Sequence, residues 1–398
     1  MTPPRSGRRL SALVGAALVV LAGACVTDEG GDEAGRLAIL DEQGRVVSIR
    51  PDGTDLTELG PAREGAFQPI WSPDGAQVAY ATRAGTPALV VADADGGSSR
   101  RVELDGASFY FSWSPSGDQL SSLRNDPDGI GLDVIDDPSS ESPVTTVDRG
   151  APYWTVWDPD GGRLFVHAGV DRLDIVDDAG GVTPLGVVPG DFRVPDWTED
   201  GLLTLAVEGG RQALVRVTPD GAVDPIAAID GLVTFAANPA GTKVAIQSLR
   251  SEGPGGAIEA ALPAQEPLPV NQLLVLDLGT GEITIASLQG VLAFWWSPEG
   301  DRLLTLHPGS GDGTLRWRVW DGTSLIDGPV FRPEASFVDE FLVFFDQYAR
   351  SMTLWAPDGS RYSFPGRIGE EDGVWVADAL TGQVEKVADG TWVAWSPS

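Results

Sequence analysis

The chain has 398 residues, with 58 acidic against 27 basic side chains and a formal net charge of −31. Such an acidic excess argues against nucleic-acid binding, because phosphate recognition needs a basic surface. Gly (50) and Pro (30) are abundant beside a normal apolar share of 42%, so the composition indicates many tight turns around a packed core rather than disorder.

The first 24 residues are typical of an export signal. Three arginines, at positions 5, 8 and 9, precede the apolar stretch Leu10–Leu21, which is too short to favour a membrane span. The stretch ends in Leu21-Ala22-Gly23-Ala24-Cys25, which resembles a bacterial lipobox. We therefore expect a signal peptide over 1–24, lipidation of Cys25 and a flexible tether over 25–35. This predicts an extracytoplasmic protein anchored at the bacterial cell membrane; the alternative is an ordinary secretory signal.

From residue 36 onward a short phrase recurs about every 40 residues, first as Trp71-Ser72-Pro73-Asp74-Gly75. Pro, Asp and Gly are turn residues, and the flanking residues are β-branched and aromatic, as strands require. The copy at 237–241 begins with alanine, whereas the others begin with Trp71, Trp113, Trp157, Trp197, Trp296, Trp355 and Trp395. We expect these tryptophans to close an inner strand and to wedge between neighbouring units.

A second hairpin follows the phrase in each unit, as in 88–96 leading into 99–104. Two hairpins give four antiparallel strands, which is one propeller blade. The units resemble the PD40 (WD40-like) repeats of TolB-type β-propellers over residues 36–398. We therefore predict a monomeric, all-β chain with a single propeller domain of eight blades, or seven if one divergent unit is not a blade. Pairing of the strands near residues 37–40 and 391–395 is expected to close the ring and remove exposed sheet edges.

Because the strands of a blade run in alternating directions, the turns between its first and second strands and between its third and fourth strands lie on the same face. Every phrase turn therefore lies on one face of the propeller, which we call the turn face. The opposite face, the loop face, receives the long insertions 251–269, 307–313 and 335–350. Because functional residues concentrate on variable loops, we expect binding at the loop face. In the last insertion, Ser336 is expected to cap a helix with an aromatic side. It is predicted to dock a partner, or else to plug the propeller's own rim, with Phe337, Phe341, Phe344, Phe345 and Tyr348.

Catalytic signals are weak. The two histidines, His167 and His307, lie far apart, and neither a Gly-x-Ser-x-Gly elbow nor a zinc-ligand cluster is present in the sequence. This predicts a chain that is not an enzyme and has no catalytic or metal-binding residues; a channel-sited hydrolase or lyase built on a carboxylate pair is the less favoured reading. No cofactor is expected. Calcium is the one candidate, because the turn face is rich in Asp, which turn chemistry also explains.

The resemblance to TolB-type propellers implies a protein partner. The predicted function is that of a membrane-anchored, extracytoplasmic β-propeller that serves as a protein-binding or scaffold module of the cell envelope, with an envelope or transporter protein as partner. The alternative is binding or sensing of a small ligand, a glycan or a peptide. A protein partner predicts exposed apolar residues on the loop face, whereas a small ligand predicts a closed pocket lined by Trp and Arg, for which Trp317, Arg318 and Trp320 are candidates.

Overall fold

The structure is a computed structural model that describes residues 35–60, 65–141, 143–229, 231–249, 258–260, 272–288, 290–348 and 351–397. The chain divides into two compact units, Met1–Asp32 and Glu33–Ser398, and the described residues belong to the second. The predicted signal peptide, Cys25, the tether up to residue 34 and most of insertion 251–269 lie outside them. Within the described residues no helix is long and apolar enough to span a membrane.

Local turn chemistry explains the basic unit, which β4 (Ala66–Trp71), β5 (Gln77–Thr82), β6 (Ala88–Asp93) and β7 (Ser99–Glu103) represent. These strands are antiparallel neighbours in chain order. In the turn after β4, the backbone N–H of Gln77 donates to Ser72 Oγ at 2.9 Å. Gly75, at φ +70°, takes the left-handed conformation that the turn requires. The phrase thus forms the hairpin that the sequence predicts.

Three further sheets follow the same order, and a fourth gains a strand. They are β8 (Ser108–Trp113), β9 (Gln119–Asp126), β10 (Gly129–Asp136), β11 (Val144–Gly150); β12 (Tyr153–Trp157), β13 (Arg163–Ala168), β14 (Arg172–Asp177), β15 (Val182–Pro184); β20 (Leu232–Ala237), β21 (Lys243–Leu249), β23 (Leu273–Asp277), β24 (Ile283–Ser287); and β16 (Asp196–Thr198), β17 (Gly201–Glu208), β18 (Arg211–Val217), β19 (Val223–Ile229), to which β22 (Ile258–Ala260) is added. The strand β22 comes from insertion 251–269, so this part of the insertion extends a neighbouring sheet rather than projecting from it.

The next sheet has seven strands: β25 (Ala293–Trp296), β26 (Leu303–Pro308), β27 (Leu315–Trp320), β28 (Leu325–Pro333), β29 (Arg361–Ile368), β30 (Glu371–Asp378) and β31 (Val384–Ala388). Its two halves join through only two residue pairs between β28 and β29. An isolated bridge between Trp355 and Tyr362 stands where an inner strand of a separate blade would lie. Counting this sheet as one blade gives seven and as two gives eight, so the blade number stays a prediction.

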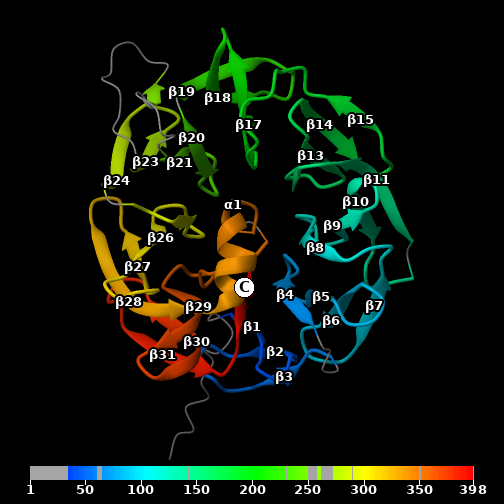
Figure 1. The fold of residues 1–398 in the computed structure, drawn as a ribbon, viewed down its shortest axis with the longest axis vertical. Coiled ribbons are helices and arrows are strands. Elements are labelled where there is room, and N and C mark those ends of the chain that lie inside the picture. The colour runs from blue at the N-terminus through cyan, green and yellow to red at the C-terminus, as the bar shows by residue number, and fades with distance from the viewer. Residues whose placement is uncertain are drawn as a thin grey trace, which may run out of the picture. The chain divides into compact units, whose positions relative to one another are not determined.

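The chain ends close the ring, as predicted. The strand β1 (Leu37–Leu40) pairs on one side with β2 (Val46–Ile49), which continues to β3 (Thr57–Glu58). On its other side β1 pairs with β32 (Trp392–Trp395), in a register that sets Leu37 opposite Trp395. Figure 1 shows the sheets arranged radially around a central axis, with the blue and red ends of the chain side by side. The prediction of an all-β propeller closed by its terminal strands is confirmed.

Indole N–H groups connect neighbouring sheets at four of the phrase tryptophans. Each donates to the backbone carbonyl of the residue just before the phrase of the preceding unit. The bonds run from Trp71 to Ala394 (3.1 Å), from Trp157 to Ser112 (3.3 Å), from Trp296 to Ala236 (2.9 Å) and from Trp355 to Trp295 (3.3 Å). We call these bonds the tryptophan latches. In the part of the chain that is described, the indole N–H groups of Trp113, Trp197 and Trp395 have no hydrogen-bond partner.

The phrases also contact one another directly. Gly117, at φ +79°, lies so close to the phrase of the preceding unit that an added Cβ would stand 3.4 Å from Pro73 Cδ. Gly300 repeats this arrangement at φ +70°, with Pro239 Cδ at 3.0 Å from the added Cβ. The phrase glycine therefore serves both the turn and the packing of consecutive units around the ring.

The latch of Trp71 is expected to stabilise the closed ring measurably. Trp71 and Trp113 are both 8% exposed, but only Trp71 donates an indole hydrogen bond among the described residues. Replacing each with Phe removes similar apolar contacts, so we expect Trp71→Phe to cost about 1 kcal/mol more of the free energy of unfolding than Trp113→Phe. Chemical denaturation of both variants measures this difference; equal losses would show that the latch contributes nothing.

Candidate binding faces of the propeller

Insertion 335–350 is helical, as predicted, but its geometry is irregular. It contains a π-helical turn, η1 (Phe337–Phe341), a 3₁₀ turn, η2 (Leu342–Phe344), and a final α-helical turn, α1 (Phe345–Tyr348). The prediction that Ser336 caps the helix is wrong. Its hydroxyl donates instead to the Thr391 carbonyl at 3.3 Å, a contact with the chain just before β32. In Figure 1 α1 lies near the centre of the ring.

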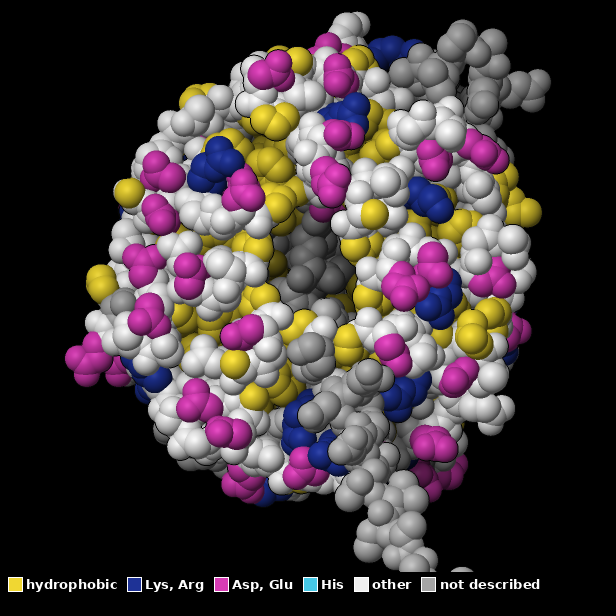
Figure 2. Space-filling view, turned by 180° about the vertical axis from the view of Figure 1, so that it is seen from behind, with side chains coloured by type: hydrophobic (Ala, Val, Ile, Leu, Met, Phe, Trp, Pro, Cys, Tyr) yellow, Lys and Arg dark blue, Asp and Glu magenta, His cyan; other side chains and the backbone are white. Residues whose placement is uncertain are grey.

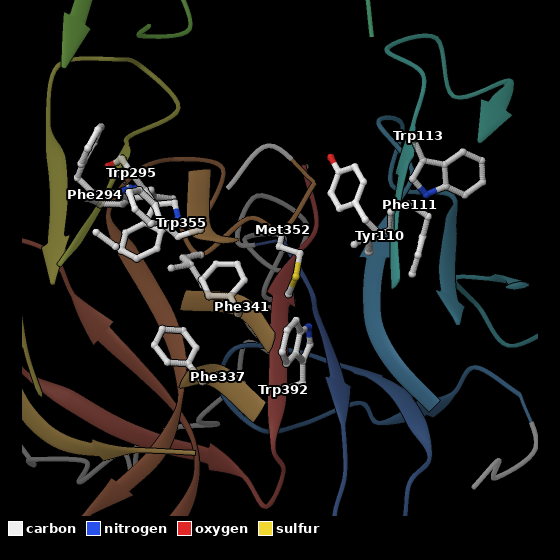
Figure 3. Close-up of a cluster of buried hydrophobic side chains, with 14 of the residues drawn as sticks. Tyr110, Phe111, Trp113, Phe294, Trp295, Phe337, Phe341, Met352, Trp355 and Trp392 are labelled. Atoms are coloured by element: carbon white, nitrogen blue, oxygen red, sulfur yellow. Dashed lines mark hydrogen bonds between the residues drawn. The ribbon is translucent and has the colours of Figure 1, made fainter. Parts of the chain in front are cut away.

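The aromatic side of this segment faces the propeller's own core. Phe337, Phe341 and Phe345 are 2%, 1% and 9% exposed. The ring of Phe341 stacks on Trp295, with centroids 5.9 Å apart, and meets Trp392 edge-on at the same distance. Figure 3 shows Phe337 and Phe341 between these blades, beside Met352 and Trp392. This is the arrangement expected of a plug, and it leaves these three rings no surface for a partner.

The outer side of the plug is different. Phe344, another predicted docking residue, is 44% exposed, and its neighbour Val343 is 63% exposed. Phe344 meets Trp154 of β12 edge-on at 6.2 Å. The side chain of Tyr348, the fifth predicted residue, lies outside the described residues. The structure therefore divides the predicted docking set into three buried rings and one exposed ring.

Polar contacts hold the plug to distant parts of the ring. The Gln347 side-chain amide donates to the Thr155 carbonyl on β12 at 2.9 Å, and both partners are buried. Glu340 forms an ion pair with Arg83, which follows β5, at 3.1 Å. Together with the aromatic contacts to β25 and β32, these bonds tie the plug to strands from several sides of the axis. The plug is thus fixed in place rather than laid on the rim.

Exposed large hydrophobic residues gather on the loop face. Loops between the second and third strands of a blade, and links between blades, all reach this face. Among the described residues, twelve large hydrophobic side chains are exposed, and eight of them stand at such loops, links or strand ends: Val170, Val188, Val207, Leu232, Leu288, Leu292, Val343 and Phe344. Of the other four, Leu56, Val182 and Leu380 stand at turn-face hairpins and Ile285 lies within β24. Exposed apolar residues on the loop face are the feature expected of a surface that binds a protein partner.

The turn face contains an axial hollow. The phrase turns and inner strands bound a cavity of about 330 Å³ whose walls include Trp71, Trp113, Trp157, Trp395, Tyr110 and Thr353. Its lining contains no charged residue. Figure 2 shows that one face of the molecule is hollow at its centre, with hydrophobic side chains around much of the opening and an acidic side chain at its rim. The sequence shows each of these tryptophans, but not that they share one cavity.

The predicted Trp–Arg pocket does not form as expected. Trp317 and Arg318 are consecutive on β27 and so point to opposite faces of the sheet. Trp317 is fully buried and stacks on Phe331 at 5.7 Å, whereas Arg318 pairs with Asp327 at 2.7 Å. Trp320 is also buried. A cavity of about 440 Å³ beside Arg318 is instead lined by Arg316, His307 and the loop that follows His307.

The structure does not bring the two histidines together. His167 lies on β13 and His307 on β26, in different sheets. Burial lowers the pKa of His167. Burial first, and then the charge of Arg318, lowers the pKa of His307 to about 4. Both imidazoles are therefore neutral at physiological pH, which suits structural groups in a protein core.

Aspartates of the turns are held by their own turns. The Ser72 hydroxyl and the Ala76 N–H lower the pKa of Asp74. In the hairpin after β27, the backbone N–H groups of Ser324 and Thr323 lower the pKa of Asp321 to about 2. No group of three or more metal-ligand side chains stands together within the described ranges. Turn chemistry accounts for these carboxylates, while calcium binding stays an untested expectation.

No family model and no curated protein matches the chain. Solved structures match its fold. A eukaryotic initiation factor matches with a TM-score of 0.57 and 12% sequence identity, and the match covers 92% of this chain and 99% of the factor. The dihydro-heme d1 dehydrogenase NirN matches with a TM-score of 0.53 and 13% identity, and the match covers 92% of this chain and 75% of NirN. TolB from Acinetobacter baumannii is 17% identical over 75% of this chain, with a TM-score of 0.40, and the chain spans 64% of its length.

The two likenesses with TM-scores above 0.5 support the β-propeller fold, and the fold alone. They also correct one prediction. The sequence predicts a chain that is not an enzyme, yet NirN, a dehydrogenase by name, shares the fold. A missing catalytic motif is therefore no ground for calling this chain a non-enzyme, because one fold supports many activities.

The plug is expected to contribute to stability through its buried rings. Phe341→Ala removes a fully buried ring between Trp295 and Trp392 and should lower the free energy of unfolding by about 3–5 kcal/mol. Val343→Ala, two residues away but exposed, should cost no more than about 0.5 kcal/mol. Denaturant titration of both variants distinguishes a packed plug from a loosely held segment, for which the two losses would be alike.

Proposed function

We propose that the chain is an extracytoplasmic binding module of the bacterial cell envelope, held at the membrane by lipidated Cys25, and that it engages a protein partner through the loop face. The partner is an envelope or transporter protein. The observation that carries this proposal is the excess of exposed large hydrophobic side chains at loops and links of that face, Val343 and Phe344 on the outer side of the plug among them.

The exposed side chains of the loop face are suited to contact with another protein. Soluble monomers rarely expose large apolar areas unless another surface covers them. Val343 and Phe344 stand on a segment that aromatic packing and the Gln347–Thr155 bond hold in place. A partner would therefore meet a preorganised surface and would not have to order the plug first. The long insertions that reach the same face provide variable contacts around it.

Site-specific photo-crosslinking in cells tests the choice of face. Val343 and Leu380 are matched in exposure, at 63% and 62%, but belong to the loop face and to the turn face. With a benzophenone amino acid at each position in turn, we expect a discrete adduct with one envelope protein from position 343 and none from position 380. Adducts from both positions alike, or from position 380 only, would contradict the proposed loop-face partner.

Metabolic labelling tests the anchor separately. Cells fed an alkyne fatty acid should incorporate it into the wild-type chain and not into Cys25→Ala, because Cys25 is the only thiol in the sequence. The labelled wild type should fractionate with membranes. An unlabelled wild-type chain, or label that persists in Cys25→Ala, would show that the anchor has been misassigned.

A further inference from the structure

Two arginines line the cavity of about 440 Å³ at the loop between β26 and β27, on the loop face. Because Arg316 and Arg318 are two residues apart on β27, their side chains point to the same side of the sheet. These side chains are 28% and 21% exposed, so a ligand can reach both guanidinium groups. His307, directly opposite Arg316 on β26, is neutral, because burial and then the charge of Arg318 lower its pKa to about 4. Among the described lining residues, only the two guanidinium groups are charged.

The positive charge of Arg316 is only partly balanced. Asp327 of β28 stands opposite Arg318 in the strand register, and one of its carboxylate oxygens pairs with Arg318 Nε at 2.7 Å. The other oxygen of the same carboxylate pairs with a terminal nitrogen of Arg316 at 3.0 Å. Within the described ranges, Asp327 is the one acidic residue that pairs with Arg316. Arg316 therefore has beside it only a share of one negative charge, although the chain as a whole has a net charge of −31.

We propose that this cavity binds a ligand through a carboxylate group, which Arg316 receives. A guanidinium group presents its N–H donors in a planar fork that matches the two oxygens of a carboxylate. The single negative charge of a carboxylate completes the balance that Asp327 provides in part, whereas a phosphate dianion sets a larger charge beside Asp327 and is repelled by it.

The cavity also has room for the rest of such a ligand. Its volume of about 440 Å³ lies in the range of small-molecule sites, and the exposed residues Pro308 and Ser310 are part of its lining. The carboxylate can belong to a free acid or to the end of a peptide chain, since both present the same group. The site lies on the loop face but does not depend on the proposed protein partner.

Calorimetric titration of the detergent-solubilised full chain with matched acids and amides tests the proposal. The probes are benzoate with benzamide, N-acetyl-dialanine with its C-terminal amide, and inorganic phosphate. Each amide keeps the shape of its acid but lacks the charge. We expect at least one acid to bind the wild type at least about tenfold more tightly than its amide does, because only the acid forms charge-assisted hydrogen bonds.

Three variants test whether the arginine cluster is responsible. Arg316→Gln should weaken binding of the acid at least about tenfold. Arg332→Gln removes the same charge from an exposed position on β28 outside the described lining, so it should leave the affinity unchanged. Asp327→Asn removes the competing carboxylate and should strengthen binding about threefold, a gain that damage to the fold would not produce. Melting temperatures equal to that of the wild type establish that the variants are folded.

The proposal is overturned if neither acid binds, if the amides bind as tightly as the acids, or if inorganic phosphate binds more tightly than both acids. It is also overturned if Arg332→Gln weakens binding as much as Arg316→Gln does, or if Asp327→Asn weakens it. Binding of benzoate alone supports a free acid as the ligand, and binding of N-acetyl-dialanine alone supports the end of a peptide chain. Crosslinking at position 343 tests the protein partner independently of these results.

Discussion

The structure depends on contacts between the two ends of the chain. Three of them coincide: β1 pairs with β32, Trp71 donates to Ala394 across 323 sequence positions, and Gly35 packs against Ser396. Joining such distant residues costs loop-closure entropy, which the intervening blades must already have offset by packing. The closing contacts are therefore available only to an almost complete ring, and they remove the two sheet edges that an open propeller would expose.

The closed ring leaves space along its axis, and the chain treats the two ends of that space differently. Toward the loop face, the plug buries Phe337, Phe341 and Phe345 and presents Val343 and Phe344 outward. Toward the turn face, four of the phrase tryptophans, Trp71, Trp113, Trp157 and Trp395, line a cavity without charged residues. The two ends of that space therefore differ chemically, with exposed apolar side chains at one end and a cavity lined by uncharged residues at the other.

Much of the fold is predictable from the sequence because the repeated phrase is local chemistry. Its Pro, Asp and Gly fix a turn, its period gives the architecture, and incomplete first and last units imply closure. The plug was harder to predict. Helical spacing shows that Phe337, Phe341 and Phe345 share a side, but not whether a partner or the chain's own blades cover it. The π-turn that begins the segment has no sequence signature in the pattern.

The candidate sites show the same limit. Trp317 and Arg318 are adjacent in sequence, yet strand alternation sends them to opposite sides of β27. A tryptophan latch forms only where a backbone carbonyl of the preceding unit faces the indole N–H. The pairing register of the strands and the spacing of the blades decide whether this happens. Trp113 and Trp71 begin nearly identical phrases, but only Trp71 finds an acceptor among the described residues. Neither this difference nor the shared axial hollow can be deduced from the repeat alone.

Native-state hydrogen exchange of the terminal strands tests the account most directly. If the ring exists as one cooperative unit closed by its ends, the paired amides of β1 and β32 exchange only through global unfolding, with the same free energy as amides in the central strands of β4–β7. Exchange of the terminal strands at a much lower free energy, as in fraying chain ends, would show that the blades persist without closure and would contradict the central role given to it.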